Sequence, residues 1–265
     1  MPRSVIHIAT LHYRDESWID IQLRELERHT SEEYRVYACL DGVGREHFDR
    51  FHHAVERDEP IVPELAYLYG VIIDQADPDD MLVVMHGDSF PIADWAGPVR
   101  RMLAARPLAG IRRDENLGEP HPHWVFTATT PRFWTELGVD WSRGPKWTGT
   151  NGLEATDLGA NLWRALEDGG HEWTPILRTN TVDLHPLWFG VYGDIVYHHG
   201  AAFRKPLSRI DADSAPPKAL FPLRYLALER TARSSARISR ELYDRIAAGE
   251  EIWWELAERP PALER

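Results

Sequence analysis

The alternation of short apolar runs with helix-period segments over the first 112 residues most constrains the fold. Short apolar runs bounded by polar or glycine positions are typical of buried strands, whereas apolar residues three and four apart are typical of helices. This order of strand, helix and strand predicts an α/β fold with a mostly parallel sheet flanked by helices. The expected strands are Ser4–Thr10, Tyr34–Leu40, Met81–Met85 and Leu108–Ile111, and the expected helices are Ser17–His29, Pro63–Gln75 and Trp95–Ala105.

The rest of the chain has a less regular pattern. We expect a strand at His123–Ala128, a short helix beginning at Pro131, a helix at Ala155–Leu166 and short strands over Leu187–His198. Residues 206–217 are typical of a linker, and Leu220–Leu256 has a mostly helical pattern. We therefore predict one large domain over residues 1–205, with a linker and a helical C-terminal extension over 206–265.

Composition narrows the classes of function. The 265 residues include 42 acidic and 30 basic side chains, and the net charge of −12 disfavours binding to a nucleic-acid backbone. The single cysteine, Cys39, excludes an internal disulfide and a four-cysteine zinc site. The most apolar stretches, Leu65–Asp74 and Met81–Met85, are far shorter than the roughly 20 residues that cross a bilayer. We therefore expect a cytoplasmic protein with no transmembrane segment and no nucleic-acid partner.

Polar residues follow several of the expected strands. In an open α/β sheet, ligands bind beyond the carboxyl ends of the strands. This rule selects Thr10–Arg14, Asp41–Gly44, His86–Phe90 and the later pair His198-His199. Imidazole is a good ligand for Mn²⁺ or Zn²⁺, and His86, Asp88 and His198 together could hold a metal ion on a diphosphate. Taken alone, a His-x-Asp segment is more often a helix cap or a hydrogen-bonded loop, and a His–His pair is more often structural than metal-binding.

Two further carboxylates are candidates for chemistry. Asp41 ends the second expected strand, where it could accept hydrogen bonds from a ribose or a base edge, or could simply precede the turn at Gly42. Asp157 lies near the start of the helix expected at Ala155–Leu166. It is a candidate general base, although a carboxylate at a helix N-terminus is also stabilised there by the helix dipole.

With these residues in place, the chain resembles the GT-A (Rossmann-like) nucleotide-sugar glycosyltransferases of the family 2 type over residues 4–204. The segment Ala9–Arg14 is similar to their first nucleotide-contacting loop, and Asp41 to their base-recognising aspartate. The phrase His86-Gly-Asp88-Ser-Phe-Pro is similar to their metal-binding D-x-D phrase, with His86 in place of the first acid. Tyr197-His198-His199-Gly200 looks like the element whose histidine completes the metal site.

The resemblance implies an activity and a set of roles. The activity is metal-dependent transfer of a sugar, of the hexosyltransferase type, from a UDP-, dTDP- or GDP-linked donor to the hydroxyl of an unknown acceptor. Asp157 is implied as the general base of an inverting reaction. The residues implied at the nucleotide are Thr10, Tyr13, Arg14, Asp41 and Asp88, and those at Mn²⁺ or Mg²⁺ are His86, Asp88 and His198.

Two other functions fit the same residues. A metallohydrolase would use His86, Asp88, His121, His123 and His198, and would retain zinc on purification. A non-catalytic nucleotide- or sugar-binding protein would bind the donor without turnover, because one fold hosts many activities. The C-terminal Trp253-Trp254 pair could pack on the catalytic domain or on a second chain, so a homodimer is among the expected assemblies.

Overall fold

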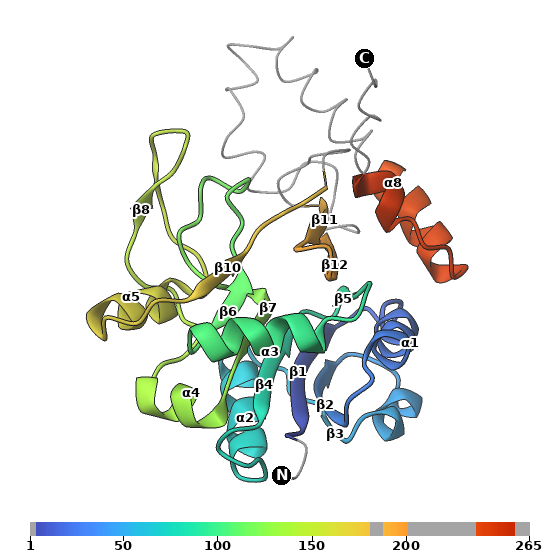
Figure 1. Ribbon diagram of the computed structural model, residues 1–265. Coiled ribbons are helices and arrows are strands. Elements are labelled where there is room, and N and C mark those ends of the chain that lie inside the picture. Colours follow the sequence, from blue (N-terminus) through green and yellow to red (C-terminus); the bar gives the residue numbers. More distant parts are fainter. Residues whose placement is uncertain (1–3, 181–187, 201–236, 258–265) are drawn as a thin grey trace. The chain divides into compact units, whose positions relative to one another are not determined.

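The computed structural model describes residues 4–180, 188–200 and 237–257. Its largest element is a seven-stranded sheet in the order β10-β6-β7-β4-β1-β2-β3 (Figure 1). These strands are β1 (Ile6–Tyr13), β2 (Tyr34–Asp41), β3 (His53–Val55), β4 (Met81–Met85), β6 (Ala109–Ile111), β7 (His123–Thr129) and β10 (Thr174–Ile176). The helices are α1 (Ile19–His29), α2 (Ile61–Ile73), α3 (Ala96–Ala105), α4 (Pro131–Leu137), α5 (Ala160–Asp168) and α8 (Trp253–Ala257), with a 3-10 turn η1 (Arg45–Arg50).

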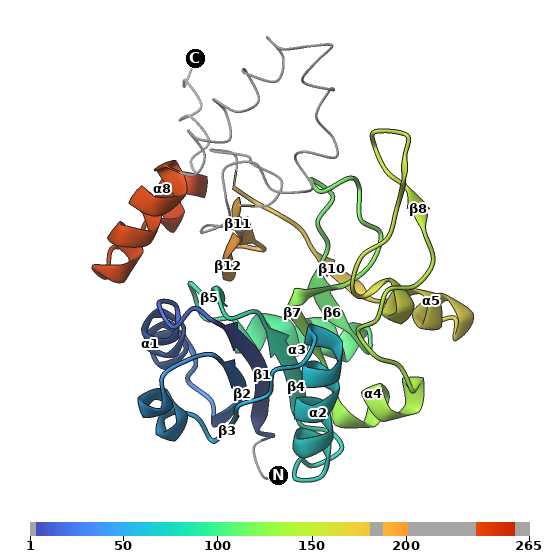
Figure 2. The same ribbon diagram turned by 180° about the vertical axis from the view of Figure 1, so that it is seen from behind.

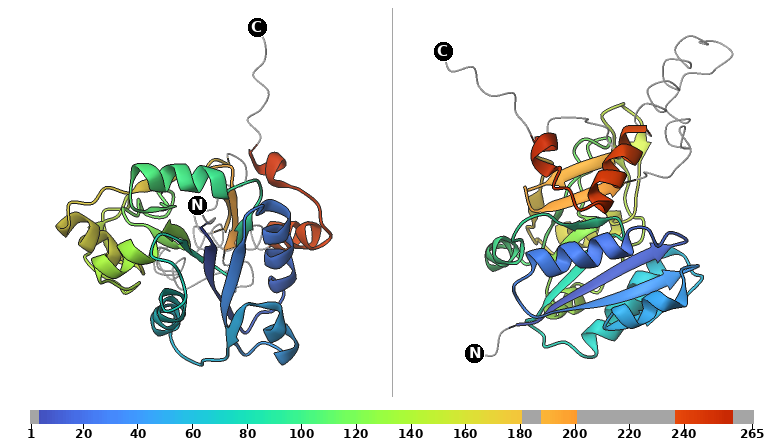
Figure 3. Two further views of the ribbon diagram at one scale, coloured as in Figure 1. Left: turned by 60° about the horizontal axis from the view of Figure 1, so that its bottom comes forward. Right: turned by 90° about the vertical axis from the view of Figure 1, so that its right-hand side faces the viewer.

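The large sheet is mostly parallel, as the sequence predicts. β1 is parallel to both β2 and β4, and β2 is parallel to β3. The two arrows of β1 and β2 can be followed side by side in the right-hand view of Figure 3. β7 runs antiparallel to its neighbours β4 and β6. Because of this reversal, the beginning of β7 lies at the edge of the sheet where β1, β2 and β4 end.

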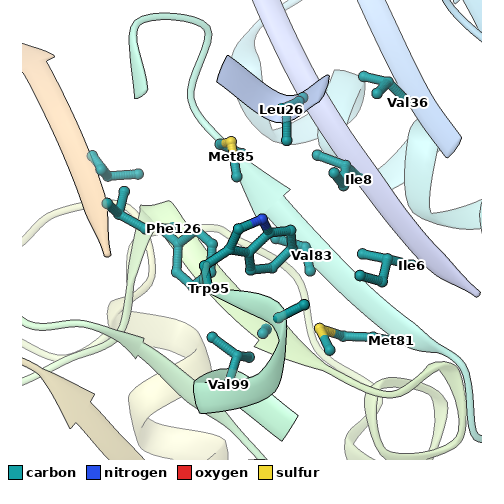
Figure 4. Packing of buried hydrophobic residues seen from close by; sticks show 14 of the residues in the cluster. Ile6, Ile8, Leu26, Val36, Met81, Val83, Met85, Trp95, Val99 and Phe126 are labelled. Carbon is teal, nitrogen blue, oxygen red and sulfur yellow. The ribbon is translucent and has the colours of Figure 1, made fainter. Parts of the chain in front are cut away.

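The helices cover both faces of this sheet. Successive side chains of a strand point to opposite faces, so a fully buried strand is apolar throughout. On one face, Ile6 and Ile8 of β1 pack with Leu26 of α1 and Val99 of α3 (Figure 4). On the other face, Ala9 and Leu11 pack in a second cluster with residues of α2, α4 and α5. Figure 1 shows α3 in front of the sheet, and Figure 2 shows α2 in front from the opposite side.

Two small sheets lie beside the large one. The first has the order β11-β12-β5, with β5 (Ser89–Pro91), β11 (Trp188–Tyr192) and β12 (Val196–Gly200). The second is the pair β8 (Trp147–Thr148) and β9 (Glu154–Ala155). β5 was not expected from the sequence. β5 is important for the arrangement of the later residues, because it pairs antiparallel with β12, which follows it by more than a hundred residues in the sequence.

The helix expected at Ala155–Leu166 begins later than predicted, at Ala160. Glu154 and Ala155 belong instead to β9. Gly159 precedes the helix with a φ of +97°, a backbone conformation that residues with a Cβ rarely adopt. A Cβ at Gly159 would also lie 2.6 Å from the carbonyl oxygen of Pro122. Asp157 therefore lies in the segment between β9 and α5 and is not in the first turn of the helix.

The chain divides into two compact units, Met1–Thr179 with Val191–His198, and Asn180–Gly190 with His199–Arg265. The domain boundary predicted at residue 205 falls outside the described residues and stays a prediction. Within 237–257, residues 237–247 are helical and α8 follows. Gly249, with a φ of +87°, lies between these helices. No helix among the described residues has both the length and the apolar character needed to cross a membrane.

Candidate functional site

The carboxyl ends of the central strands meet at one edge of the large sheet, as the sequence predicts. β1 lies between β2 and β4, and Tyr13 at the end of β1 pairs in register with Asp41 at the end of β2. His86 follows directly after β4, and its N–H donates to the carbonyl oxygen of Val125 in β7 at 3.0 Å. Three of the four segments that were selected because they follow expected strands therefore lie at this edge of the sheet.

The fourth segment reaches the same edge through strand pairing. β12 pairs with β5 so that His198 lies opposite Ser89, one residue beyond Asp88. Each of His86, Asp88 and His198 offers one ligand atom, and these atoms all lie within 4.8 Å of one another. The three residues that the sequence singled out as metal ligands are thus brought together, although their role stays a prediction.

Both histidines contact one oxygen of Asp88. His86 Nδ1 is hydrogen-bonded to Asp88 Oδ1, and His198 Nε2 lies 3.4 Å from the same oxygen. The side chain of His86 is 31% exposed and that of His198 is 7% exposed, so His86 forms the solvent side of the cluster. Burial raises the pKa of Asp88, but the two neighbouring imidazoles outweigh it and hold that pKa well below its usual range.

The donor set fits a divalent transition metal. Imidazole nitrogens suit Zn²⁺, Fe²⁺ and related ions, whereas carboxylates also suit Mn²⁺ and Mg²⁺. Two imidazoles and one carboxylate would fill three positions on an ion and leave others open for a ligand. A second group of three, Glu16, Glu46 and His47, also lies within ligand reach. Its two carboxylates are on exposed residues, where such clusters are common without an ion.

Gln22, a residue that sequence reasoning missed, fixes the loop that carries these ligands. Its amide nitrogen donates to the carbonyl oxygens of His86 at 2.8 Å and Ser89 at 2.9 Å. Its amide oxygen accepts from the Thr10 hydroxyl at 3.1 Å and lies 3.2 Å from His12 Nε2. The fully buried Gln22 therefore has all four hydrogen bonds that its side chain can readily make.

Replacing Gln22 with leucine is expected to weaken Mn²⁺ binding by about 10–100-fold, the range measured when residues that orient metal ligands are removed. Leucine has a similar volume but removes the amide donor from two loop carbonyl oxygens, of which that of His86 still accepts from the Ser89 N–H and hydroxyl at 2.9 Å. Calorimetric titration of Mn²⁺ into the folded variant measures the effect. Gln75→Leu, at an exposed glutamine after α2, is the matched control. Unchanged affinity in the Gln22 variant would show that the loop is fixed by its other contacts.

Histidine burial predicts a pH-dependent stability. Burial lowers the pKa of His12 to about 4, with a hydrogen bond to Gln22 opposing the shift. Burial likewise lowers the pKa of His7, of His123 and of His198. A depressed folded-state pKa means that the unfolded chain binds protons first, so stability is full above the unfolded pKa near 6.5 and falls below it. For His12, the loss by pH 4 is about 3 kcal/mol.

Urea unfolding at pH 7.5 and pH 5, with a chelator present, measures this dependence. We expect the free energy of unfolding to drop toward pH 5, and to drop less in His12→Asn. His52→Asn, which removes a histidine at an exposed position, should retain the full drop. Equal stability of the unmodified chain at the two pH values would contradict the expectation.

The beginning of β7 contributes aromatic and histidine side chains to the same edge. The ring of Trp124 lies edge-on to His86, with centroids 4.2 Å apart, so Trp124 packs directly beside the group formed by His86, Asp88 and His198. His123 Nδ1 accepts a hydrogen bond from the Val125 N–H at 3.1 Å. Within the described residues, the metal-ligand group includes neither His121 nor His123. Three of the five residues that the metallohydrolase hypothesis invokes are therefore brought together.

Asp157 is held by Arg113, which sequence reasoning also missed. Arg113 Nη2 lies 3.2 Å from Asp157 Oδ2, and the N–H of Leu158 donates to Asp157 Oδ1 at 2.8 Å. Arg113 also forms a two-bond ion pair with Glu119, at 2.8 and 2.6 Å. Asp157 therefore shares its arginine with a second carboxylate, and its side chain remains partly exposed.

The residues predicted to contact a nucleotide differ in how far they are exposed to solvent. Tyr13 is 57% exposed, and the Arg14 guanidinium lies 4.8 Å from the centre of its ring. The Arg14 N–H donates to the Asp41 carbonyl oxygen at 2.7 Å. Asp41 is buried, and its Oδ2 atom has no hydrogen-bond partner. Thr10 is fully buried and its hydroxyl donates to Gln22, which in turn positions the loop that carries His86 and Asp88.

Comparisons with known proteins find distant structural similarities only. No family model matches the chain, and no curated protein sequence matches it. Similar solved structures include the galactosyltransferase LgtC in complex with donor and acceptor sugar analogs, at 11% identity and a TM-score of 0.44, covering 97% of this chain and 98% of that one. The apo-form glycosyltransferase GlyE of Streptococcus pneumoniae TIGR4 has 13% identity and a TM-score of 0.41, covering 65% of this chain and 45% of that one.

The apo structure of the bifunctional glycosyltransferase WbbM has 10% identity and a TM-score of 0.38, covering 51% of this chain and 33% of that one. The matches thus span less than half of the GlyE and WbbM chains. All three structures are of glycosyltransferases. Because all three TM-scores are below 0.5, fold and function are argued from this chain's own residues.

Proposed function

We propose that this protein is a metal-dependent glycosyltransferase that moves a sugar from a nucleoside-diphosphate donor to an acceptor hydroxyl. The observation that carries the proposal is the convergence of His86, Asp88 and His198 within 4.8 Å of one another. They lie at the sheet edge where β1 and β2 also end, which is where ligands bind in open α/β sheets. The transferred sugar is proposed to be a hexose, as the sequence resemblance implies.

The proposed metal is Mn²⁺ in preference to Mg²⁺. Mg²⁺ favours an all-oxygen shell, whereas two of the three donors here are imidazole nitrogens. When bound, the ion would supply positive charge to the diphosphate leaving group. His198 and Asp88 are buried and the loop is fixed by Gln22, so the chain holds these donors in place before any ligand arrives.

The nucleoside is proposed to lie over the ends of β1 and β2. Tyr13 offers an exposed ring there, and Asp41 offers a carboxylate oxygen with no protein partner. β1 separates β2 from β4, so two strand spacings, about 10 Å, lie between Asp41 and the metal cluster. This spacing places base recognition and diphosphate binding at different points of one extended site.

Asp157 is proposed as the base that takes the acceptor's proton, if the reaction inverts the sugar configuration. Asp157→Asn is then expected to lower kcat by about 100–10,000-fold, the usual contribution of a general base. The dissociation constant of the donor should stay unchanged, because Asp157 is not among the three residues proposed to hold the metal. Initial rates and donor titration measure both quantities, with the exposed Glu154→Gln as control. An unchanged kcat would exclude Asp157 as the base.

Calorimetric titration of UDP, dTDP and GDP, each with and without Mn²⁺, tests the proposed function. Mn²⁺-dependent binding of at least one of them is expected, followed by turnover of the matching nucleotide sugar. Absence of any nucleotide binding by folded protein would overturn the proposal. Tightly held zinc, found by elemental analysis, would favour the hydrolase, because Zn²⁺ also takes two imidazoles and a carboxylate. Donor binding without turnover for any acceptor would indicate a binding protein.

A further inference from the structure

Three buried polar atoms without hydrogen-bond partners belong to residues near the end of β2. They are Asp41 Oδ2, Glu64 Oε1 and Arg57 Nε. Asp41 is 6% exposed and Glu64 is 4% exposed. Buried polar groups are nearly always hydrogen-bonded. A buried polar group without a partner has lost its hydrogen bonds to water and has formed none in the protein, which costs free energy. Three such atoms in one neighbourhood call for a ligand that supplies their partners.

The strand register and one side-chain contact bring these residues together. β3 is parallel to β2 with Val55 opposite Cys39, and Arg57 follows two residues after β3 ends. The charges of both Asp41 and Arg57 act on Glu64. The Cys39 thiol lies 4.0 Å from the carbonyl oxygen of Glu64. Glu64 is in the first turn of α2, which packs on β1 and β2. Two carboxyl groups and one guanidinium therefore surround the end of β2.

The electrostatics agree with this placement. Burial raises the pKa of Glu64 to about 7, a backbone hydrogen bond from Glu59 opposes the shift, and the charge of Asp41 adds to it. A carboxyl group keeps an acceptor oxygen whether or not it is protonated. Arg57 Nη2 donates to Glu59 Oε1 at 2.6 Å, and the guanidinium carbon lies 4.5 Å from the centre of the Tyr67 ring. Glu59 and Tyr67 therefore hold the Arg57 side chain in place without using its Nε atom.

We propose that Asp41, Glu64 and Arg57 recognise a guanine base, so that the donor is a GDP-linked sugar. This inference rests on the proposed function. Two acceptor oxygens and one N–H require a ligand edge with two adjacent donors and one acceptor. Guanine presents N1–H, the N2 amino group and O6 along one edge. Uracil and thymine present a single donor between two carbonyl oxygens, one of which would face a carboxylate. Cytosine and adenine have only one amino donor.

The test compares the dissociation constants of GDP, IDP and UDP in the presence of Mn²⁺. All three carry the same diphosphate, and IDP differs from GDP only in lacking the N2 amino group. A hydrogen bond to a charged group is expected to favour GDP over IDP by about 10–100-fold. UDP should bind more weakly still, because it leaves buried carboxylate oxygens unpaired. These ratios need no variant and are independent of any folding defect.

Glu64→Gln tests the role of one carboxyl group. This substitution keeps the shape of the side chain but replaces one carboxylate oxygen, an acceptor, with an amide group, a donor. It is expected to reduce the preference for GDP over UDP by at least about tenfold. Glu136→Gln, at an exposed carboxylate of α4 on the opposite edge of the sheet, should leave the preference unchanged. Tighter Mn²⁺-dependent binding of UDP, or equal binding of GDP and IDP, would overturn the guanine inference while the proposed function stands. If no nucleotide binds, the proposed function itself fails.

Discussion

Replacing Asp88 with asparagine is expected to lower Mn²⁺-dependent nucleotide binding and turnover by about 100-fold or more, because a metal ion contributes several kcal/mol to such reactions. Asp88 is the only anionic member of the cluster, and both His86 and His198 contact its Oδ1 atom. Asparagine keeps the shape and one acceptor oxygen but removes the negative charge. Calorimetry with Mn²⁺ and GDP, together with initial rates, measures the loss.

Asp94→Asn is the matched control, since Asp94 is an exposed carboxylate six residues further along the chain. It should bind Mn²⁺ as the unmodified chain does. Thermal unfolding of both variants separates a loss of ligand from a loss of fold. Full Mn²⁺-dependent turnover by a folded Asp88→Asn protein would remove this cluster from the mechanism.

Replacing Arg113 with methionine is expected to lower the free energy of unfolding by about 3–5 kcal/mol, the usual cost of removing one partner of a buried ion pair. Glu119 is 1% exposed and would be left as a buried charge, with Asn116 as its remaining hydrogen-bond donor. The same substitution would also release Asp157. Urea unfolding at pH 7.5 measures the change.

Two further variants make this test specific. Arg113→Met combined with Glu119→Leu should recover much of the loss, because a buried ion pair can often be replaced by apolar residues at little cost. Arg112→Met removes the neighbouring arginine, whose two-bond pair with Asp114 is more exposed. Its cost should stay below about 1 kcal/mol. Equal costs for the two arginines would show that the Arg113 pair is solvated.

Local pattern and connection rules predicted most of the sheet. β4 has the predicted bounds Met81–Met85, because these residues form a fully apolar run between the polar residues Asp80 and His86. The parallel pairing of β1 with β2 and β4 follows from their helical connections. The reversed direction of β7 and the short strands β3 and β5 were not predicted. The direction of β7 and the presence of β3 and β5 depend on pairing with strands that are distant in the sequence. A strand of three residues, such as β3 or β5, is also too short to show a clear periodic pattern.

The candidate site was predictable only where it follows strand ends. His86 and Asp88 directly follow the apolar strand β4, and His198 was selected as an imidazole at the end of an expected strand, although it lies within β12. Gln22 and Arg113 were missed because nothing near them in the sequence indicates what they bond. Gln22 reaches carbonyl oxygens more than sixty residues away, and Arg113 meets Asp157 across forty-four. The helix expected around Asp157 was placed too early, because the pairing of β9 with β8 was not foreseen.

The pairing of β12 with β5 also has a consequence for the order of events during folding. His198 joins Asp88 across more than a hundred residues, so closing that loop carries an entropic cost that nearby contacts do not share. The paired strands β1, β2 and β4 all precede β12 in the chain, so they are synthesised before it. The third proposed metal ligand, His198, can join His86 and Asp88 only after β12 has been synthesised and has paired with β5. Proposed metal binding therefore depends on a pairing that forms later than the strands that carry the first two ligands.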